Sequence, residues 1–202
     1  MNIHRSQSGF SLVEVLVAIT ILLMVITGPM TIMSRANNST AFATEQATAF
    51  FLAQEGLELA QKGRDDLLLR YWQRQINGSG GITNPMTRFE LAYPACFTPT
   101  GCGLTINNAA PALVTYQACS GLNCLLYISI SATVRSMYVH TAAGNTASPY
   151  TRTITMQRIN NASSGRVQEF QVTSTVTWRT GSLIAGQKVE LVTYLANVYD
   201  TN

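Results

Sequence analysis

Apolar residues dominate a stretch near the N-terminus of the chain. Residues 10–33 read FSLVEVLVAITILLMVITGPMTIM and contain one charged residue, Glu14. An α-helix rises about 1.5 Å per residue, so about 20 residues cross the hydrocarbon core of a bilayer. Arg5 and the amino terminus carry positive charge before the stretch, and Arg35 is the only charge after it until Glu45. This weak bias favours a cytoplasmic N-terminus. The pattern predicts a single membrane-spanning helix, with the rest of the chain exported.

A helical pattern continues beyond this stretch. We expect the helix to end near Lys62, and a second, short helix to run from Leu67 to Gln75 with Asp65 and Asp66 as its N-cap. The glycine-rich residues 77–81 then end the helical part. Small and apolar residues recur at helical spacing and predict the face that packs on a domain: Ala43, Ala47, Phe50, Leu57 and Ala60.

The remainder of the chain, from residue 77, changes to a period of two. Apolar residues alternate with Thr, Ser, Tyr or Gln, which predicts half-buried antiparallel strands with a threonine-rich exposed face. In the last strand Val192, Tyr194, Ala196 and Val198 form the apolar side, and residues 181–186 close the last hairpin. The predicted fold class is α+β, a long N-terminal helix packed on an antiparallel β-sheet. The alternating segments lie within residues 126–134, 153–156, 170–178 and 192–198.

The apolar stretch has three interpretations. A cleaved secretory signal peptide has an apolar region of only about 7–15 residues, although Ser34-Arg35-Ala36 loosely fits its cleavage site. A plain membrane anchor leaves Glu14 unexplained, because a carboxylate in the bilayer costs about 2.5–3.5 kcal/mol even on a lenient scale. Snorkelling of Glu14 to the interface lowers that cost without removing it. The third interpretation accounts for the charge.

The segment Gly9-Phe10-Ser11-Leu12-Val13-Glu14, followed by the apolar stretch, resembles the class III signal of type IV pilins and type II secretion pseudopilins. The resemblance implies that a prepilin peptidase cleaves after Gly9 and methylates Phe10. The new amine of Phe10 on one subunit could then meet Glu14 of a neighbour, which gives a buried carboxylate its cation. Other pilins, the peptidase and an inner-membrane assembly platform are the implied partners. The implied location is the inner membrane, followed by an extracellular pilus or a periplasmic pseudopilus.

Two further segments fit the same family. Gly28 and Pro29 interrupt the apolar stretch, and because proline removes a helical hydrogen bond they predict a kink or a melted turn. In pilins a similar break lets the helix stretch during assembly. Residues 52–58 read LAQEGLE and resemble the LAxEGxE signature of PilV-type minor pilins.

These features predict a pilin-like fold in four parts. Residues 1–9 are the leader peptide, and residues 10–34 are the transmembrane and assembly half of the N-terminal helix. Residues 35–76 are the amphipathic half that packs on the sheet. Residues 77–202 form the antiparallel β region, with a cysteine-containing insertion at about 85–125.

Four cysteines lie within that insertion: Cys96, Cys102, Cys119 and Cys124. In an exported chain they indicate disulfides, which can pair in three ways. Their spacing does not match the usual zinc-binding pairs. Turn residues between the cysteines of each neighbouring pair favour the local bonds Cys96–Cys102 and Cys119–Cys124. Because residues 125–202 follow the last cysteine, this arrangement differs from the C-terminal disulfide loop of many major pilins and argues for a minor subunit.

Composition limits the chemistry. Charged residues make up 11% of the chain, against about 25% in typical soluble proteins. A net charge of +3 without a basic cluster makes nucleic-acid binding unlikely but does not exclude it. His4 and His140 are the two histidines, which argues against a histidine-rich metal site or a Ser-His-Asp enzyme. The apolar stripe of the helix is typical of a packing face, so we expect no cofactor.

The function expected from the sequence is therefore structural rather than enzymatic. The first hypothesis is a PilV-like minor type IV pilin that joins a pilus or primes its assembly, for adhesion, motility or DNA uptake. The second is a pseudopilin of a type II secretion system. The third is an adhesive tip subunit that binds through the insertion at about 85–125.

The class III signal predicts that the mature chain begins at Phe10. Mass spectrometry of the protein from its native membrane should find residues 10–202 with one added methyl group. An N-terminus at Asn37 would instead establish an ordinary signal peptide and contradict the pilin interpretation.

Overall fold

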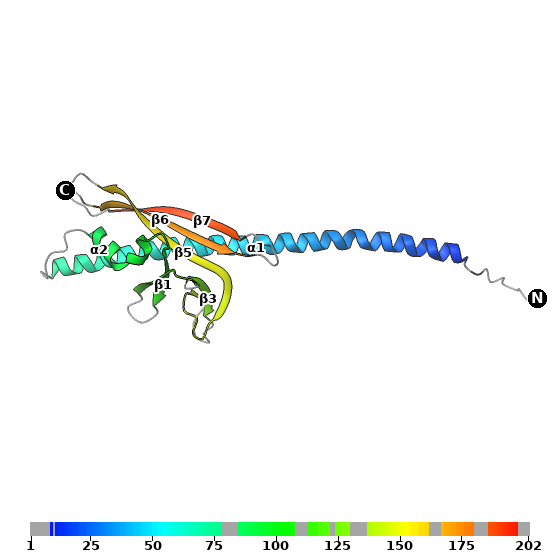
Figure 1. Cartoon of the computed structure of the whole chain (residues 1–202), viewed down its shortest axis with the longest axis horizontal. Helices are drawn as coiled ribbons and strands as arrows, with labels where there is room; N and C mark the ends of the chain where they lie inside the picture. Colours follow the sequence, from blue (N-terminus) through cyan, green and yellow to red (C-terminus); the bar gives the residue numbers. More distant parts are fainter. Residues whose placement is uncertain are drawn as a thin grey trace, which may run out of the picture. The chain divides into compact units, whose positions relative to one another are not determined.

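The computed structural model describes residues 9, 11–77, 85–107, 113–121, 124–129, 137–161, 167–179 and 186–197. The chain divides into two compact units, residues 1–44 and 45–202. Its helices are α1 (Leu12–Ile76), α2 (Pro85–Ala92) and the short 3₁₀ helix η1 (Pro94–Phe97) (Figure 1). The described strands are β1 (Cys102–Asn107), β2 (Leu113–Ala118), β3 (Leu125–Ser129), β4 (Met137–Val139), β5 (Thr146–Asn161), β6 (Val167–Trp178) and β7 (Gln187–Ala196).

Strand β5 is the centre of a seven-stranded antiparallel sheet. Along one edge β5 pairs with β6, which pairs with β7. Along the opposite edge β5 pairs with β1 through Ile154 and with β3 through Thr151. Strands β2 and β4 extend that side by pairing with β1 and β3. Strand β5 thus joins β6 and β7 on one side of the sheet to the shorter strands β1, β2, β3 and β4 on the other.

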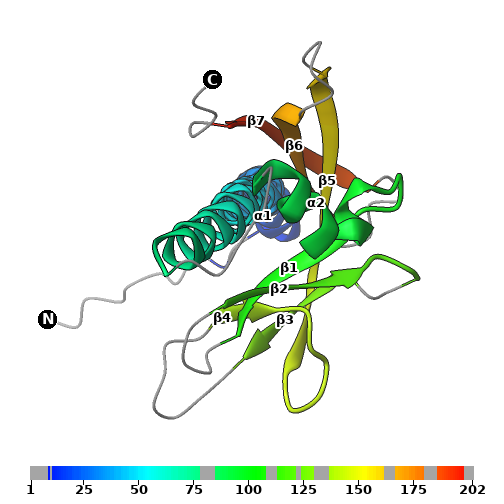
Figure 2. The same cartoon turned by 90° about the vertical axis from the view of Figure 1, so that its left-hand side faces the viewer.

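The C-terminal part of α1 packs on this sheet (Figure 2). Two clusters of buried side chains make the contact, and both combine alanine and leucine residues of α1 with residues of the sheet; α2 adds Met86 and Phe89 to one of them. One contains Ala49, Leu52, Ala53, Leu126, Tyr150, Val176 and Trp178. The other includes Leu59, Ala60, Met86, Phe89, Leu104, Ile154, Phe170 and Val172. The α+β fold class, a long helix on an antiparallel sheet, is confirmed.

The buried face of α1 differs from the predicted one. Ala43, Ala47 and Phe50 are exposed, and of the five predicted positions only Ala60 is fully buried. The predicted stripe has the wrong phase around the helix axis, and the buried face combines leucines with alanines and glycines. The residues of this part of the helix that are buried are Ala49, Leu52, Ala53, Gly56, Leu59, Ala60, Gly63 and Leu68.

The predicted end of the helix near Lys62 and the separate short helix are also wrong. Helix α1 continues through Gly63 to Ile76, so Asp65 and Asp66 are not an N-cap. A Cβ atom at Gly63 would lie 2.8 Å from the hydroxyl of Tyr93, so this glycine makes room for an aromatic ring instead of ending the helix. The carboxylate of Asp66 pairs with Lys62 one turn earlier, at 2.9 Å.

Strand β7 has the opposite phase from the predicted one. Val192 and Tyr194 are 44% and 57% exposed, whereas Leu195 is buried and Leu191 is half-buried. The register with β6 explains the difference, because Leu195 pairs with the buried Phe170 and Leu191 with the buried Ser174. Both faces of this strand carry apolar residues, so alternation alone cannot identify the inner face. Residues 130–134, 181–185 and Val198, which the predicted strands and hairpin include, lie outside the described residues.

At Gly56 helix α1 lies close to the sheet. A Cβ atom there would lie 2.5 Å from Ser174 Oγ and 2.7 Å from Ile154 Cδ1. We expect Gly56→Val to lower the free energy of unfolding by about 1–3 kcal/mol through overpacking. Chemical denaturation of the full-length protein in detergent, followed by near-UV circular dichroism, measures the change.

Gly28→Val is the matched control in the same helix. A Cβ atom at Gly28 has no described residue within 4 Å, so this variant should leave the transition unchanged. Equal stability of the two variants would contradict close packing at Gly56.

Candidate functional site

Glu14 lies in the first turn of α1. The turn begins with a hydrogen bond from the Val15 amide to the Ser11 carbonyl oxygen, at 3.2 Å. Glu14 is exposed, and no described ion pair or hydrogen bond involves it. Interaction with the helix dipole favours a carboxylate at this end of a helix, but it supplies no counter-ion. Gly9 is described and exposed, while Phe10 lies outside the described residues.

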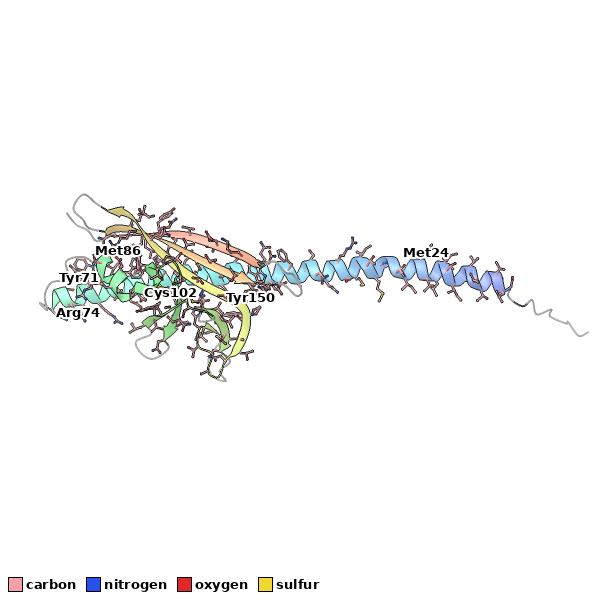
Figure 3. All side chains as sticks on the ribbon, in the orientation of Figure 1. Met24, Tyr71, Arg74, Met86, Cys102 and Tyr150 are labelled. Atoms are coloured by element: carbon pink, nitrogen blue, oxygen red, sulfur yellow. A yellow bond between two sulfur atoms is a disulfide. The ribbon has the colours of Figure 1, made fainter. Side chains whose placement is uncertain are left out.

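An apolar surface surrounds Glu14. A shallow groove along the helix is lined by Glu14, Val15, Ala18, Ile19 and Leu22. Side chains on all sides of this segment stand out from the bare helix (Figure 3), and both Leu12 and Met24 are 79% exposed. In length and composition α1 could cross a membrane, and its most apolar window has no buried residue. This segment therefore needs lipid or other apolar helices around it.

Gly28 and Pro29 lie within α1, which is helical on both sides of them. The predicted melted turn is not present in this structure. The Thr31 hydroxyl donates a hydrogen bond to the Gly28 carbonyl oxygen at 2.8 Å, next to the place where proline removes a helical bond. The pair is thus a weakened point of a continuous helix.

Comparison with protein families identifies a known sequence motif at the N-terminal end of the chain. The prokaryotic N-terminal methylation motif matches residues 4–28. The chain carries the N-terminal signal of the type IV pilin and pseudopilin family. No curated protein and no solved structure matched the chain. The motif supports processing by a prepilin peptidase, pilin partners in general and a single-pass membrane anchor, and it points to a structural protein.

The cysteines of this pilin-like chain form two local pairs. Cys96 is bonded to Cys102 with Cα atoms 4.6 Å apart, and Cys119 to Cys124 with Cα atoms 5.2 Å apart. These are the pairs that the turn residues favour, and they use all four sulfur atoms. The first bond joins η1 to the start of β1 inside the buried core. The cysteine-containing segment therefore contributes to the core of the second unit and is not an appended loop.

The sheet also holds a buried cation that the sequence analysis missed. The Arg152 side chain has no exposed surface. Its Nη1 atom donates to the Leu52 carbonyl oxygen at 3.1 Å and to Glu55 Oε2 at 2.7 Å, and Nη2 donates to the Leu104 carbonyl oxygen at 3.0 Å. One guanidinium thus joins α1, β1 and β5. Burial lowers the pKa of Arg152, and the carboxylate of Glu55 opposes this shift without cancelling it.

This contact gives the LAQEGLE segment a structural role. Leu52 supplies a carbonyl oxygen, Glu55 a counter-ion, and Gly56 the space for Arg152 and Ser174. The alternation along β5 could have indicated that Arg152 is buried, because Arg152 is in phase with the buried Ile154 and Met156. A buried arginine requires an acidic partner. The alternation does not tell which carboxylate that is.

His140 lies next to this cluster and is 5% exposed. Its Nδ1 atom is 3.3 Å from the Leu125 carbonyl oxygen, so Nδ1–H is the donor, and Nε2 has no partner among the described residues. Burial, with a smaller effect of the Arg152 charge, lowers the pKa of His140 from its ordinary 6.5 to about 4. His140 is therefore a neutral core side chain at neutral pH.

The lowered pKa of His140 predicts a pH dependence of stability. Between pH 6.5 and about 4 the unfolded chain binds a proton that the folded chain does not bind. Unfolding free energy should fall as the pH is lowered through this range, by up to about 3 kcal/mol from this residue. The difference in unfolding free energy between wild type and His140→Gln, measured from pH 8 to pH 4 by chemical denaturation, should change by this amount.

Thr141→Gln is the control, since Thr141 is exposed and does not titrate. It should follow the wild-type profile. Parallel profiles for wild type and His140→Gln would show that His140 titrates normally in the folded protein.

Proposed function

We propose that this chain is a minor type IV pilin of the PilV type, which joins a pilus or primes its assembly. Glu14 carries the proposal, as a carboxylate without a described counter-ion in a bare apolar helix that bears the methylation motif. An uncompensated charge among apolar groups is costly, and a cation supplied by another subunit removes that cost.

The amine of the processed chain is the cation that fits. Cleavage after Gly9 makes Phe10 the N-terminal residue, four positions before Glu14. When two such helices lie side by side with an axial offset, the amine of one subunit reaches the carboxylate of the next. Charge pairing then fixes the offset between subunits, while the apolar side chains provide the contact area.

The LAQEGLE segment supports the PilV type rather than the family in general. The ion pair of Glu55 with Arg152, and the lack of room for a side chain at Gly56 beside Ser174, support an acidic residue and a glycine at these two positions. The position of the disulfides, followed by residues 125–202, supports a minor subunit. We place the N-terminus in the cytoplasm and residues from Arg35 onward outside the inner membrane. The methylation motif also fits a type II secretion pseudopilin, which is the second candidate.

Glu14→Gln tests the proposal. The variant keeps the size of the side chain and removes the charge that attracts the Phe10 amine. We expect normal amounts of processed protein in the membrane, with little or none in sheared fibres or in crosslinks to other pilins. Quantitative immunoblotting of both fractions measures the effect.

Glu190→Gln is the matched control, because Glu190 is an exposed carboxylate of β7 that pairs only with Lys188 among the described ion pairs. It should assemble as the wild type does. Wild-type incorporation of Glu14→Gln would mean that the carboxylate merely reaches the membrane surface. Loss of hydrolase secretion, with fibres unaffected by deletion of the gene, would favour the pseudopilin.

A further inference from the structure

A groove of about 240 Å³ lies between the C-terminal end of α1 and α2, within the second unit. Tyr71 and Arg74 mark the α1 side in Figure 3, with Met86 of α2 nearby. Three arginines line the groove, Arg70 and Arg74 from α1 and Arg88 from α2. Leu67, Leu91 and Ala92 supply apolar walls. Among its lining residues there is no acidic side chain.

The positive charge of this groove is not neutralised by the described residues. None of the described ion pairs includes Arg70, Arg74 or Arg88, and all three are exposed. The nearest candidates are occupied, since Asp65 pairs with Arg64, Asp66 with Lys62 and Glu90 with Arg158. Asp66 lies one turn before Arg70 and lines an adjoining groove with it, so it offsets part of the Arg70 charge, but its described ion pair is with Lys62. The residues between the two helices, 78–84, contain no charged residue.

Interaction with a helix dipole explains the position of one of the three arginines, but not why three arginines lie around one groove. Arg74 lies in the last turn of α1, where a cation interacts favourably with the helix dipole. Arg88 lies in the first turn of α2, where a cation is unfavourable by the same argument. Three like charges around one groove repel each other, and an anionic occupant would reverse that cost.

We propose that this groove binds an acidic segment of a partner protein that also carries a leucine-like side chain. Carboxylates match the planar donor groups of arginine. Leu91 is 67% exposed, and an aliphatic side chain of the partner would cover it, together with the apolar walls beside it. Tyr71 belongs to the same surface, and arginine and tyrosine are both enriched at the energetic centres of protein interfaces.

A nucleic acid fits the same surface less well. Affinity for a phosphate backbone increases with the number of phosphates that basic side chains neutralise, and the groove offers only three arginines. The other cations of the second unit that the structure describes near these helices are already in ion pairs. The apolar walls would face phosphate and sugar groups without a matching side chain.

Peptide binding to the full-length protein in detergent tests the proposal. The probe is a short, fluorescently labelled peptide of glutamate and leucine, compared with its glutamine and leucine counterpart. We expect the acidic peptide to bind and its glutamine counterpart not to bind. Arg88→Gln should weaken binding about fivefold, and Arg74→Gln with Arg88→Gln about 25-fold. Leu91→Ser should weaken binding at unchanged salt dependence.

Arg179→Gln is the matched control, since Arg179 is exposed and lies outside the groove. It should bind as the wild type does. All substituted residues are exposed, so we expect thermal unfolding to stay close to that of the wild type. If the double variant is unstable, binding by the single variants tests the proposal. Equal binding of both peptides, or no loss in the arginine variants, would overturn the proposal.

A short oligothymidine is the third probe. Tighter binding of oligothymidine than of the acidic peptide, lost in the same arginine variants, would assign the groove to a nucleic acid instead. The inference does not rest on the proposed function. The peptide assay requires no fibre, so failure of Glu14→Gln to block assembly and failure of peptide binding are separate results.

Discussion

The guanidinium of Arg152 holds the second unit together at the point where helix and sheet meet. It has no exposed surface and donates to Leu52 and Glu55 of α1 and to Leu104 of β1. Removing one partner of such a pair leaves a buried charge or unsatisfied carbonyl groups, which is why the arrangement tolerates little displacement. Together with the two buried clusters, this contact constrains the rotation of α1 about its axis and its distance from β5.

Close packing around Arg152 explains the composition of the helix face. Gly56 has room for a hydrogen atom only, and Ala53 and Ala60 are fully buried beside it. Large side chains of the strands fill the space that the small helix residues leave. The LAQEGLE segment is therefore the part of α1 that packs against the sheet, and this role is the same in a pilus and in a secretion system.

Because this chain has few charged residues, a charge without a counter-ion can indicate a site where another molecule binds. Charged residues are 11% of the total, and most of the described ones in the second unit are in ion pairs. Several exposed charges, Arg35 and Arg179 among them, are in no described ion pair. Two such places have apolar surroundings: Glu14 in the apolar part of α1, and the three arginines between α1 and α2. Both lack a counter-ion among the described residues, and both are explained by a partner that brings the opposite charge. The domain core supplies stability, while the charges at these two places are available for contacts with other molecules.

The sequence by itself determined the features that depend on neighbouring residues. A long apolar stretch predicts a membrane-spanning helix, a glutamate after Gly9-Phe10 indicates the methylation signal, period-two segments predict the sheet, and turn residues favour local disulfides. Only the tertiary structure decided which face of α1 is buried, which side of β7 points inward, and that Gly63 is a packing site rather than a helix end. Only it paired Arg152 with Glu55, 97 positions away. In a sequence, a glycine that ends a helix cannot be distinguished from one that makes room for a neighbouring side chain, and the partner of a carboxylate cannot be identified. Both depend on residues that become neighbours only when the chain folds.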